Sequence, residues 1–258
     1  MKNIFYMPVL VTIFTVLVSC GSSNSDHDGS SEVLKEETNV DPDAKGGNTC
    51  LLSYQEKLGE LLTGEMASSV TGLSVEKMET KLNNILKNPE YYSIEYKWKT
   101  DRTEERTVGN MTLNWPVVYF VKLQDINDRS LKEFKASYKK ATKEQVEQAN
   151  NAIDEGFDRK SGNEKVNKQI DKLDELGVDK KTQKSTSSSI GSVIGEIAQA
   201  YSDVEGVGDA ASWNSVEKRL YVLEKGVQFS ISIRMSDDDE VNKAQAIQLA
   251  KEIIAKCG

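Results

Sequence analysis

The chain has 258 residues, a formal net charge of −8 and a pI near 5.0. Nucleic-acid binding needs a basic surface, so this charge argues against nucleic acid as a partner, and equally against electrostatic attachment to anionic lipid. The length suffices for one good hydrophobic core or two small ones.

The first residues have the composition of a secretory signal peptide. Lys2 supplies a positive charge, the stretch 4–18 is mostly apolar, and the small residue Ser19 precedes Cys20. The apolar run is shorter than the roughly 20 residues that a membrane-spanning helix needs. No charged stop-transfer flank follows it. We therefore predict a cleaved signal peptide over residues 1–19 rather than a transmembrane helix.

Leu17-Val18-Ser19-Cys20 resembles the lipobox of bacterial lipoproteins. The resemblance implies cleavage before Cys20, attachment of acyl chains such as palmitate to Cys20, and a protein anchored in the cell envelope, at the outer membrane. Ser25-Asp26-His27-Asp28 is similar to the acidic export signals of surface lipoproteins in the Bacteroidota, although a plain spacer explains these residues equally well. The membrane face, periplasmic or external, stays open.

Residues 20–49 are predicted to form a flexible acidic tether. Gly21 to Thr49 holds seven acidic residues against two lysines, a net charge of −5, and few large apolar side chains. Such a segment cannot bury enough surface to offset its ordering entropy. His27, the single histidine of the chain, lies here and is expected to be solvated. A Ser-His-Asp triad is therefore not expected, and we assign no catalytic residue, no metal ligand and no cofactor.

Residues 50–258 are predicted to form one α+β ectodomain, with a first half over 50–126, a helical insertion and linker over 127–188, and a second half over 189–258. In the first half, a capping box of Ser53 and Glu56 predicts a helix that stops at Gly64. An apolar stripe predicts a second helix over 74–88, and alternation predicts strands over 94–98 and 117–123. The charged segment 99–106 is typical of a loop.

The insertion shows helical spacing of apolar residues, which predicts two amphipathic helices that could form a hairpin. The Ser/Thr/Lys-rich segment 179–189 is predicted to be a linker, and a helix is expected over 190–201. Two alternating strands around the turn 224–226 predict a β-hairpin. In the last helix, Asp237 to Asp239 are expected to cap the helix start, since they lack the ligand spacing of a calcium loop.

Gly206-x-Gly208-Asp209 precedes a hairpin rather than a helix, and it lacks the third glycine and the lysine of phosphate-binding loops. We therefore predict a structural turn at Gly206, Gly208, Asp209 and Trp213, in which the glycines allow unusual backbone angles and Asp209 accepts hydrogen bonds from turn amides.

From Val204 onward the chain is similar to a module of exported bacterial lipoproteins of unknown function, with a Gly-x-Gly-Asp-x-Ala-x-Trp turn, a hairpin and a Leu-Ala-Lys helix at Leu249-Ala250-Lys251. Cys50-Leu51-Leu52-Ser53 and Tyr96-Lys97-Trp98 are similar to its companion module. The resemblance implies an antiparallel sheet covered by helices and says nothing about a reaction. The shared helix-strand-strand outline of the two halves suggests an internal duplication.

Cys50 and Cys257 are the cysteines left once Cys20 is assigned to the lipid. Two cysteines in an exported protein most simply form a disulfide. Two reduced, buried thiols are the alternative, and a metal site is less favoured because no histidine is near. The module named above often has a cysteine near its Tyr-x-Trp position. That cysteine is absent here, which favours Cys257 as the partner of Cys50.

These features favour a non-enzymatic binding or scaffolding module that meets an unknown envelope protein or extracellular ligand. The rival is a hydrolase that acts on envelope glycans or peptides through carboxylates, which a deep acidic cleft with two facing Asp or Glu would favour. A helical arm over 127–176 that docks on an envelope complex is a third hypothesis. Trp98, Trp115 and Trp213 could line a ligand groove, although buried or edge anchors are the commoner role.

Overall fold

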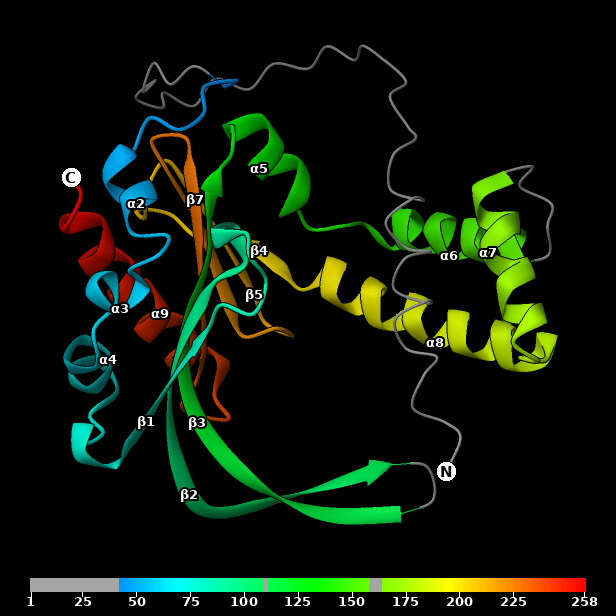
Figure 1. The fold of residues 1–258 in the computed structure, drawn as a ribbon, viewed down its shortest axis with the longest axis horizontal. Coiled ribbons are helices and arrows are strands. Elements are labelled where there is room, and N and C mark those ends of the chain that lie inside the picture. The colour runs from blue at the N-terminus through cyan, green and yellow to red at the C-terminus, as the bar shows by residue number, and fades with distance from the viewer. Residues whose placement is uncertain (1–41, 109–110, 158–163) are drawn as a thin grey trace. The chain divides into compact units, whose positions relative to one another are not determined.

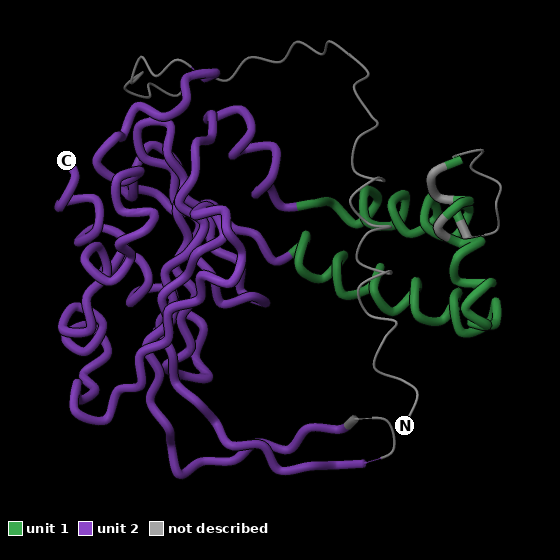
Figure 2. Tube along the Cα trace, viewed as in Figure 1, with its two compact units in different colours: residues 1–39, 141–199 green, residues 40–140, 200–258 purple. Residues whose placement is uncertain are grey.

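The computed structural model describes residues 42–108, 111–157 and 164–258. Cys20, His27 and the predicted signal peptide lie outside these residues. The chain divides into two compact units (Figure 2), a helical unit over residues 141–199 and a sheet unit built from the segments on either side of it. Within the described ranges, no helix is long and apolar enough to cross a membrane.

The sheet unit is built on a seven-stranded antiparallel sheet with the order β1-β2-β3-β7-β6-β5-β4 (Figure 1). This sheet and its helices confirm the α+β prediction. The first half of the chain contributes β1 to β3 and the second half contributes β4 to β7, and the halves meet where β3 pairs with β7. The strands are β1 (Met78–Asn83), β2 (Ser93–Val108), β3 (Met111–Asp128), β4 (Tyr201–Asp203), β5 (Ala210–Asn214), β6 (Arg219–Glu224) and β7 (Val227–Arg234).

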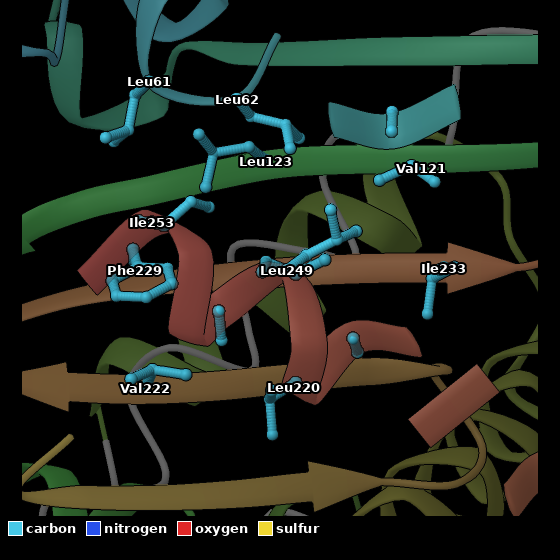
Figure 3. Packing of buried hydrophobic residues seen from close by; sticks show 14 of the residues in the cluster. Leu61, Leu62, Val121, Leu123, Leu220, Val222, Phe229, Ile233, Leu249 and Ile253 are labelled. Carbon is cyan, nitrogen blue, oxygen red and sulfur yellow. The ribbon is translucent and has the colours of Figure 1, made fainter. Parts of the chain in front are cut away.

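Four helices cover one face of the sheet, on the left in Figure 1, and one short helix lies on the other. Alternating residues of the strands point toward the four helices and form the core with them. Figure 3 shows Leu249 and Ile253 of the last helix beside Phe229 of β7 and Leu220 and Val222 of β6. The four are α2 (Thr49–Ser53), α3 (Leu58–Leu61), α4 (Gly64–Thr71) and α9 (Asp239–Ala255), and the fifth is α5 (Leu131–Ser137).

The β6–β7 hairpin forms as predicted because its turn residues suit the required backbone. Lys225 and Gly226 both have positive φ, 49° and 75°, the pattern of the turn whose twist matches a two-residue hairpin.

Gly208, in the turn before β5, has φ +58°, and a Cβ atom there would lie 2.3 Å from the Leu223 carbonyl oxygen, so only glycine fits. Backbone hydrogen bonds from Gly46 and Asn48 to the Lys225-Gly226 turn show that ordered contacts begin ahead of Cys50.

Two helix predictions in the first half are wrong. Ser53 ends α2 instead of starting a helix, because Asn48 caps that helix and the Ser53 hydroxyl donates back to the Cys50 carbonyl. The segment 74–88 holds β1 between two short 3-10 turns, η1 (Val75–Lys77) and η2 (Pro89–Tyr91). Pairing with β2 satisfies the β1 backbone and overrides its helical apolar spacing.

The predicted loop over 99–106 is also wrong, since β2 runs on to Val108. After a register shift between Lys99 and Thr103, β2 pairs with residues 111–116 of β3. This part of the hairpin has only two strands, so both of its faces meet solvent. It therefore lacks the alternation of polar and apolar residues that marks a strand with one buried face.

The helical unit contains α6 (Lys143–Phe157), α7 (Glu164–Glu175) and α8 (Lys180–Gln199). The linker predicted over 179–189 is wrong, because α8 begins at Lys180. The Asp179 carboxylate accepts from the Thr182 amide and hydroxyl at the start of this helix. Gly191 and Gly195 let α8 approach Asn150 and Val146 of α6 closely. Small and polar residues therefore form the packing face that the sequence pattern did not reveal.

Candidate ligand-binding site on the second face of the sheet

The face of the sheet opposite the four helices is polar. Strand alternation places Arg219 and Tyr221 of β6 and Gln228, Ser230 and Ser232 of β7 on this side. Helix α5 covers only part of it and buries Phe134 against Tyr221 and Leu223. The part of this face that α5 leaves uncovered can therefore hold polar side chains, which would be unfavourable in a hydrophobic core.

A β-bulge in β3 brings a carboxylate to this face. The β3–β7 register shifts between Gln124 and Asn127, and Asp125 adopts φ +61°. The extra residue lets Ile126 enter the core while the Asp125 carboxylate joins the polar face, where its Oδ2 accepts from Ser230 Oγ at 2.6 Å. Bulges often re-aim side chains beside functional sites.

A hollow of ≈ 430 Å³ lies where β3, β6, β7 and the end of α5 meet. Its volume lies within the range of small-molecule sites in proteins. Its lining residues are predominantly polar or charged, unlike most such sites: Glu90, Tyr91, Asp125, Asn127, Asp128, Arg129, Tyr138, Arg219, Tyr221 and Gln228. This lining suits a ligand rich in hydrogen-bonding groups.

Two arginines with different partners face the hollow. Arg219 is held in place, since its Nε donates to Ser232 Oγ at 2.9 Å and its Nη1 lies 3.2 Å from Tyr221 Oη and 3.6 Å from Asp125 Oδ2. Arg129 Nη1 donates to Tyr138 Oη and to Gln228 Oε1, both at 3.2 Å. Within the described residues Arg129 has no carboxylate partner, so several of its five N–H donors can serve a ligand.

Aromatic rings form the wall of the hollow toward α5. Tyr138 stacks on Tyr221 with centroids 4.1 Å apart, and Phe134 meets Tyr138 edge-on at 4.8 Å. Burial raises the pKa of Tyr138 to about 12 and also raises the pKa of Tyr221. Both phenols therefore stay protonated at neutral pH, and their oxygens accept hydrogen bonds from the two arginines.

Lys122 adds a cationic group to the same face. In the sheet register it lies between Glu95 of β2 and Ser232 of β7. Its pKa is lowered, first by burial of the ammonium group and then by repulsion from Arg219. The face thus combines partly buried cations with the Asp125 carboxylate rather than presenting one sign of charge.

The predicted site residues that lie in the described ranges have structural roles. Cys50 and Cys257 form a disulfide, as predicted, with sulfur atoms 2.01 Å apart. Gly206, Gly208 and Asp209 lie in the predicted turn, and Asp209 Oδ2 accepts from the Lys225 amide of the neighbouring turn.

The tryptophans do not line the hollow. Trp213 belongs to β5 rather than to the turn, and it is buried with its Nε1 donating to Asp239 Oδ2. Trp98 is buried in the core, and Trp115 is exposed on the two-stranded part of the β2–β3 hairpin. Asp238 caps α9 as predicted, by accepting from the Glu240 amide. The described ranges contain no cluster of three or more metal-ligating side chains.

Searches with this chain matched no protein-family model, no curated protein and no solved structure.

Sequence reasoning did not find the residues of the hollow. They come from two parts of the chain, residues 90–138 and the β6–β7 hairpin, which lie far apart in the sequence and so form no local motif. Leu131, Phe134 and Tyr138 recur at helical spacing, which predicts that Tyr138 packs in a helix rather than lining a polar site. One local signal could have indicated the polar face. In both strands of the β6–β7 hairpin, polar residues alternate with core residues: Arg219 and Tyr221 in one strand, and Gln228, Ser230 and Ser232 in the other. Because alternate side chains point to opposite faces, the second face of the hairpin had to be polar.

Proposed function

We propose that this protein is a cell-envelope lipoprotein, anchored through Cys20, whose sheet unit binds a carbohydrate in the hollow of its polar face. The position of the Arg129 guanidinium supports binding. This guanidinium lies in the hollow with hydrogen-bond donors unused by described residues and is positioned by Tyr138 and Gln228.

The mixed charge of the lining supports a ligand of low net charge. Asp125, Asp128 and Glu90 share the hollow with the two arginines, so a strongly anionic ligand would meet repulsion as well as attraction. Hydroxyl groups of a sugar can both donate to carboxylates and accept from guanidinium groups. Tyr91, which is 59 % exposed at the rim, offers an aromatic surface for the apolar face of a sugar ring.

The contacts of Asp125 support binding rather than hydrolysis. Its carboxylate is already engaged within the protein, since Oδ2 accepts from Ser230 Oγ at 2.6 Å and lies 3.6 Å from Arg219 Nη1. We therefore propose a binding module without hydrolytic activity.

Binding is tested with the full chain in detergent on a panel of immobilised neutral and acidic oligosaccharides. We expect a neutral saccharide to bind, and Arg129→Met to weaken that binding at least about tenfold, because hydrogen bonds from a charged donor contribute about 1.5–3 kcal/mol. Tyr91→Ala should weaken it severalfold.

Two exposed residues outside the hollow give matched controls. Arg102→Met removes an arginine and Trp115→Ala removes an aromatic ring elsewhere on the surface, and both should leave binding unchanged. Failure of all neutral saccharides to bind, or equal losses in the control variants, would contradict the proposal. Binding confined to acidic saccharides would indicate an anion site instead.

Anchoring is tested separately by palmitate labelling of cells that carry the wild type or Cys20→Ala. We expect the label to disappear in the variant, because no other residue is predicted to be acylated. Label that persists would contradict a lipid at Cys20. Protease treatment of intact cells then decides the membrane face: loss of the folded units would place them outside, and protection would place them in the periplasm.

A further inference from the structure

The outer edge of β1 is the longer free edge of the sheet. Strand β1 lies at one end of the strand order with six residues, and β4 lies at the other end with three. Nothing in the described part of the chain pairs with the outer edge of β1, whose residues from Glu79 to Asn83 are all exposed. A free edge presents unpaired N–H and C=O groups that can receive another strand.

Natural proteins usually protect such an edge with proline, a bulge or repelling charges. Strand β1 has the sequence Met-Glu-Thr-Lys-Leu-Asn, without proline or glycine, and its charges balance. Its pairing with β2 shows no register shift. The edge is therefore regular and suited to pairing.

We propose that β1 pairs with β1 of a second copy of this chain, antiparallel and centred on Thr80, so that the two sheets become one. This inference does not depend on the proposed ligand or on the lipid anchor.

Backbone geometry limits the registers that this pairing can take. Outward-pointing N–H and C=O groups belong to every second residue of a strand, so a symmetric pair must place residues of the same parity opposite each other. One residue of β1 must therefore lie directly opposite its own copy, with the two-fold axis midway between them. This leaves a small set of candidate centres along β1.

Charge complementarity selects Thr80 among them. Centred there, Glu79 lies opposite Lys81 of the second copy, and the symmetry repeats this pair. Centring on Glu79 or on Lys81 would place like charges directly opposite, which destabilises a sheet. Within its own chain Glu79 contacts Lys99 at 2.5 Å, whereas Lys81 has no ion pair among the described residues.

The exposed apolar side chains fit the same register. Met78 lies opposite Leu82 of the second copy, and Leu82 is 50 % exposed in a single chain. The pairing therefore covers apolar surface at both ends as well as satisfying the backbone.

Sedimentation of the full chain in detergent over a range of concentrations tests the pairing. We expect a monomer–dimer equilibrium, and Lys81→Glu should raise its dissociation constant about tenfold, because two attractive pairs become repulsive at once. The exchange Glu79→Lys with Lys81→Glu should restore the wild-type value, since it re-forms both pairs. A chain that stays monomeric, a dimer indifferent to Lys81→Glu, or assembly beyond the dimer would overturn the proposal.

A cysteine scan tests the register independently of affinity. Thr80→Cys places two thiols opposite each other and should yield a disulfide-linked dimer under mild oxidation. Asn83→Cys, also at an exposed position of the same strand, faces residue 77 of the second copy and should yield none above the wild-type background. Equal cross-linking of both variants would contradict a pairing centred on Thr80.

Discussion

Replacing Cys257 with serine is expected to lower the free energy of unfolding by about 4 kcal/mol. The Cys50–Cys257 disulfide joins positions 207 residues apart and closes nearly the whole described chain into one loop. In the chain-entropy model, opening so long a loop releases many conformations of the unfolded chain, with an upper figure of about 5 kcal/mol. Urea unfolding of the oxidised protein, with the variant unfolded in parallel, measures the difference.

The double variant Cys50→Ser, Cys257→Ser is the matched control for this effect. It should unfold close to the single variant, because both lack the same covalent link. If the wild type carried free thiols instead, a maleimide would label Cys50 and Cys257 in denaturant without a reductant. That labelling, or a wild type no more stable than the double variant, would contradict the disulfide.

Phe229→Ala should lower the free energy of unfolding by about 4 kcal/mol, within the range for large core truncations. Phe229 is fully buried in β7, the strand that pairs with β3 and so joins the two halves of the sheet (Figure 3). The truncation removes apolar burial and leaves a cavity between the sheet and α9. Denaturant unfolding measures the loss.

Trp115→Ala is the control for Phe229→Ala. It also removes an aromatic ring from a strand, but Trp115 is 46 % exposed on the two-stranded part of the β2–β3 hairpin. Its cost should stay within about 0.5 kcal/mol, as for most surface changes. Comparable losses in the two variants would show that the core does not lie between the sheet and α9.

The candidate site illustrates why some residues escaped sequence reasoning. Arg129 follows β3, whereas Arg219 and Gln228 lie on β6 and β7, and they meet because β3 lies beside β7 in the sheet. Strand order depends on which strands and helices pack their apolar faces against each other most favourably. A short stretch of sequence does not contain that information. The bulge at Asp125 likewise depends on its pairing with β7.

Elements that depend on local chemistry were determined by the sequence alone. The β6–β7 hairpin follows from alternation on both sides of Lys225-Gly226, and the start of α9 follows from Asp238 at its cap. The disulfide was predicted from the number of cysteines together with the predicted export. The hairpin and cap signals need only neighbouring residues, so no partner element could reverse them.

Tertiary structure decided the rest. Strand β1 has helical apolar spacing but extends because β2 offers its edge. Helix α8 includes residues 180–189, whose polar composition favours a linker, and its Gly191 and Gly195 pack closely on α6. The hollow exists because β3, α5, β6 and β7 converge on one face of the sheet. In each case the free energy of pairing or packing with a distant element exceeds the weak local preference, and that free energy is absent from any short stretch of sequence.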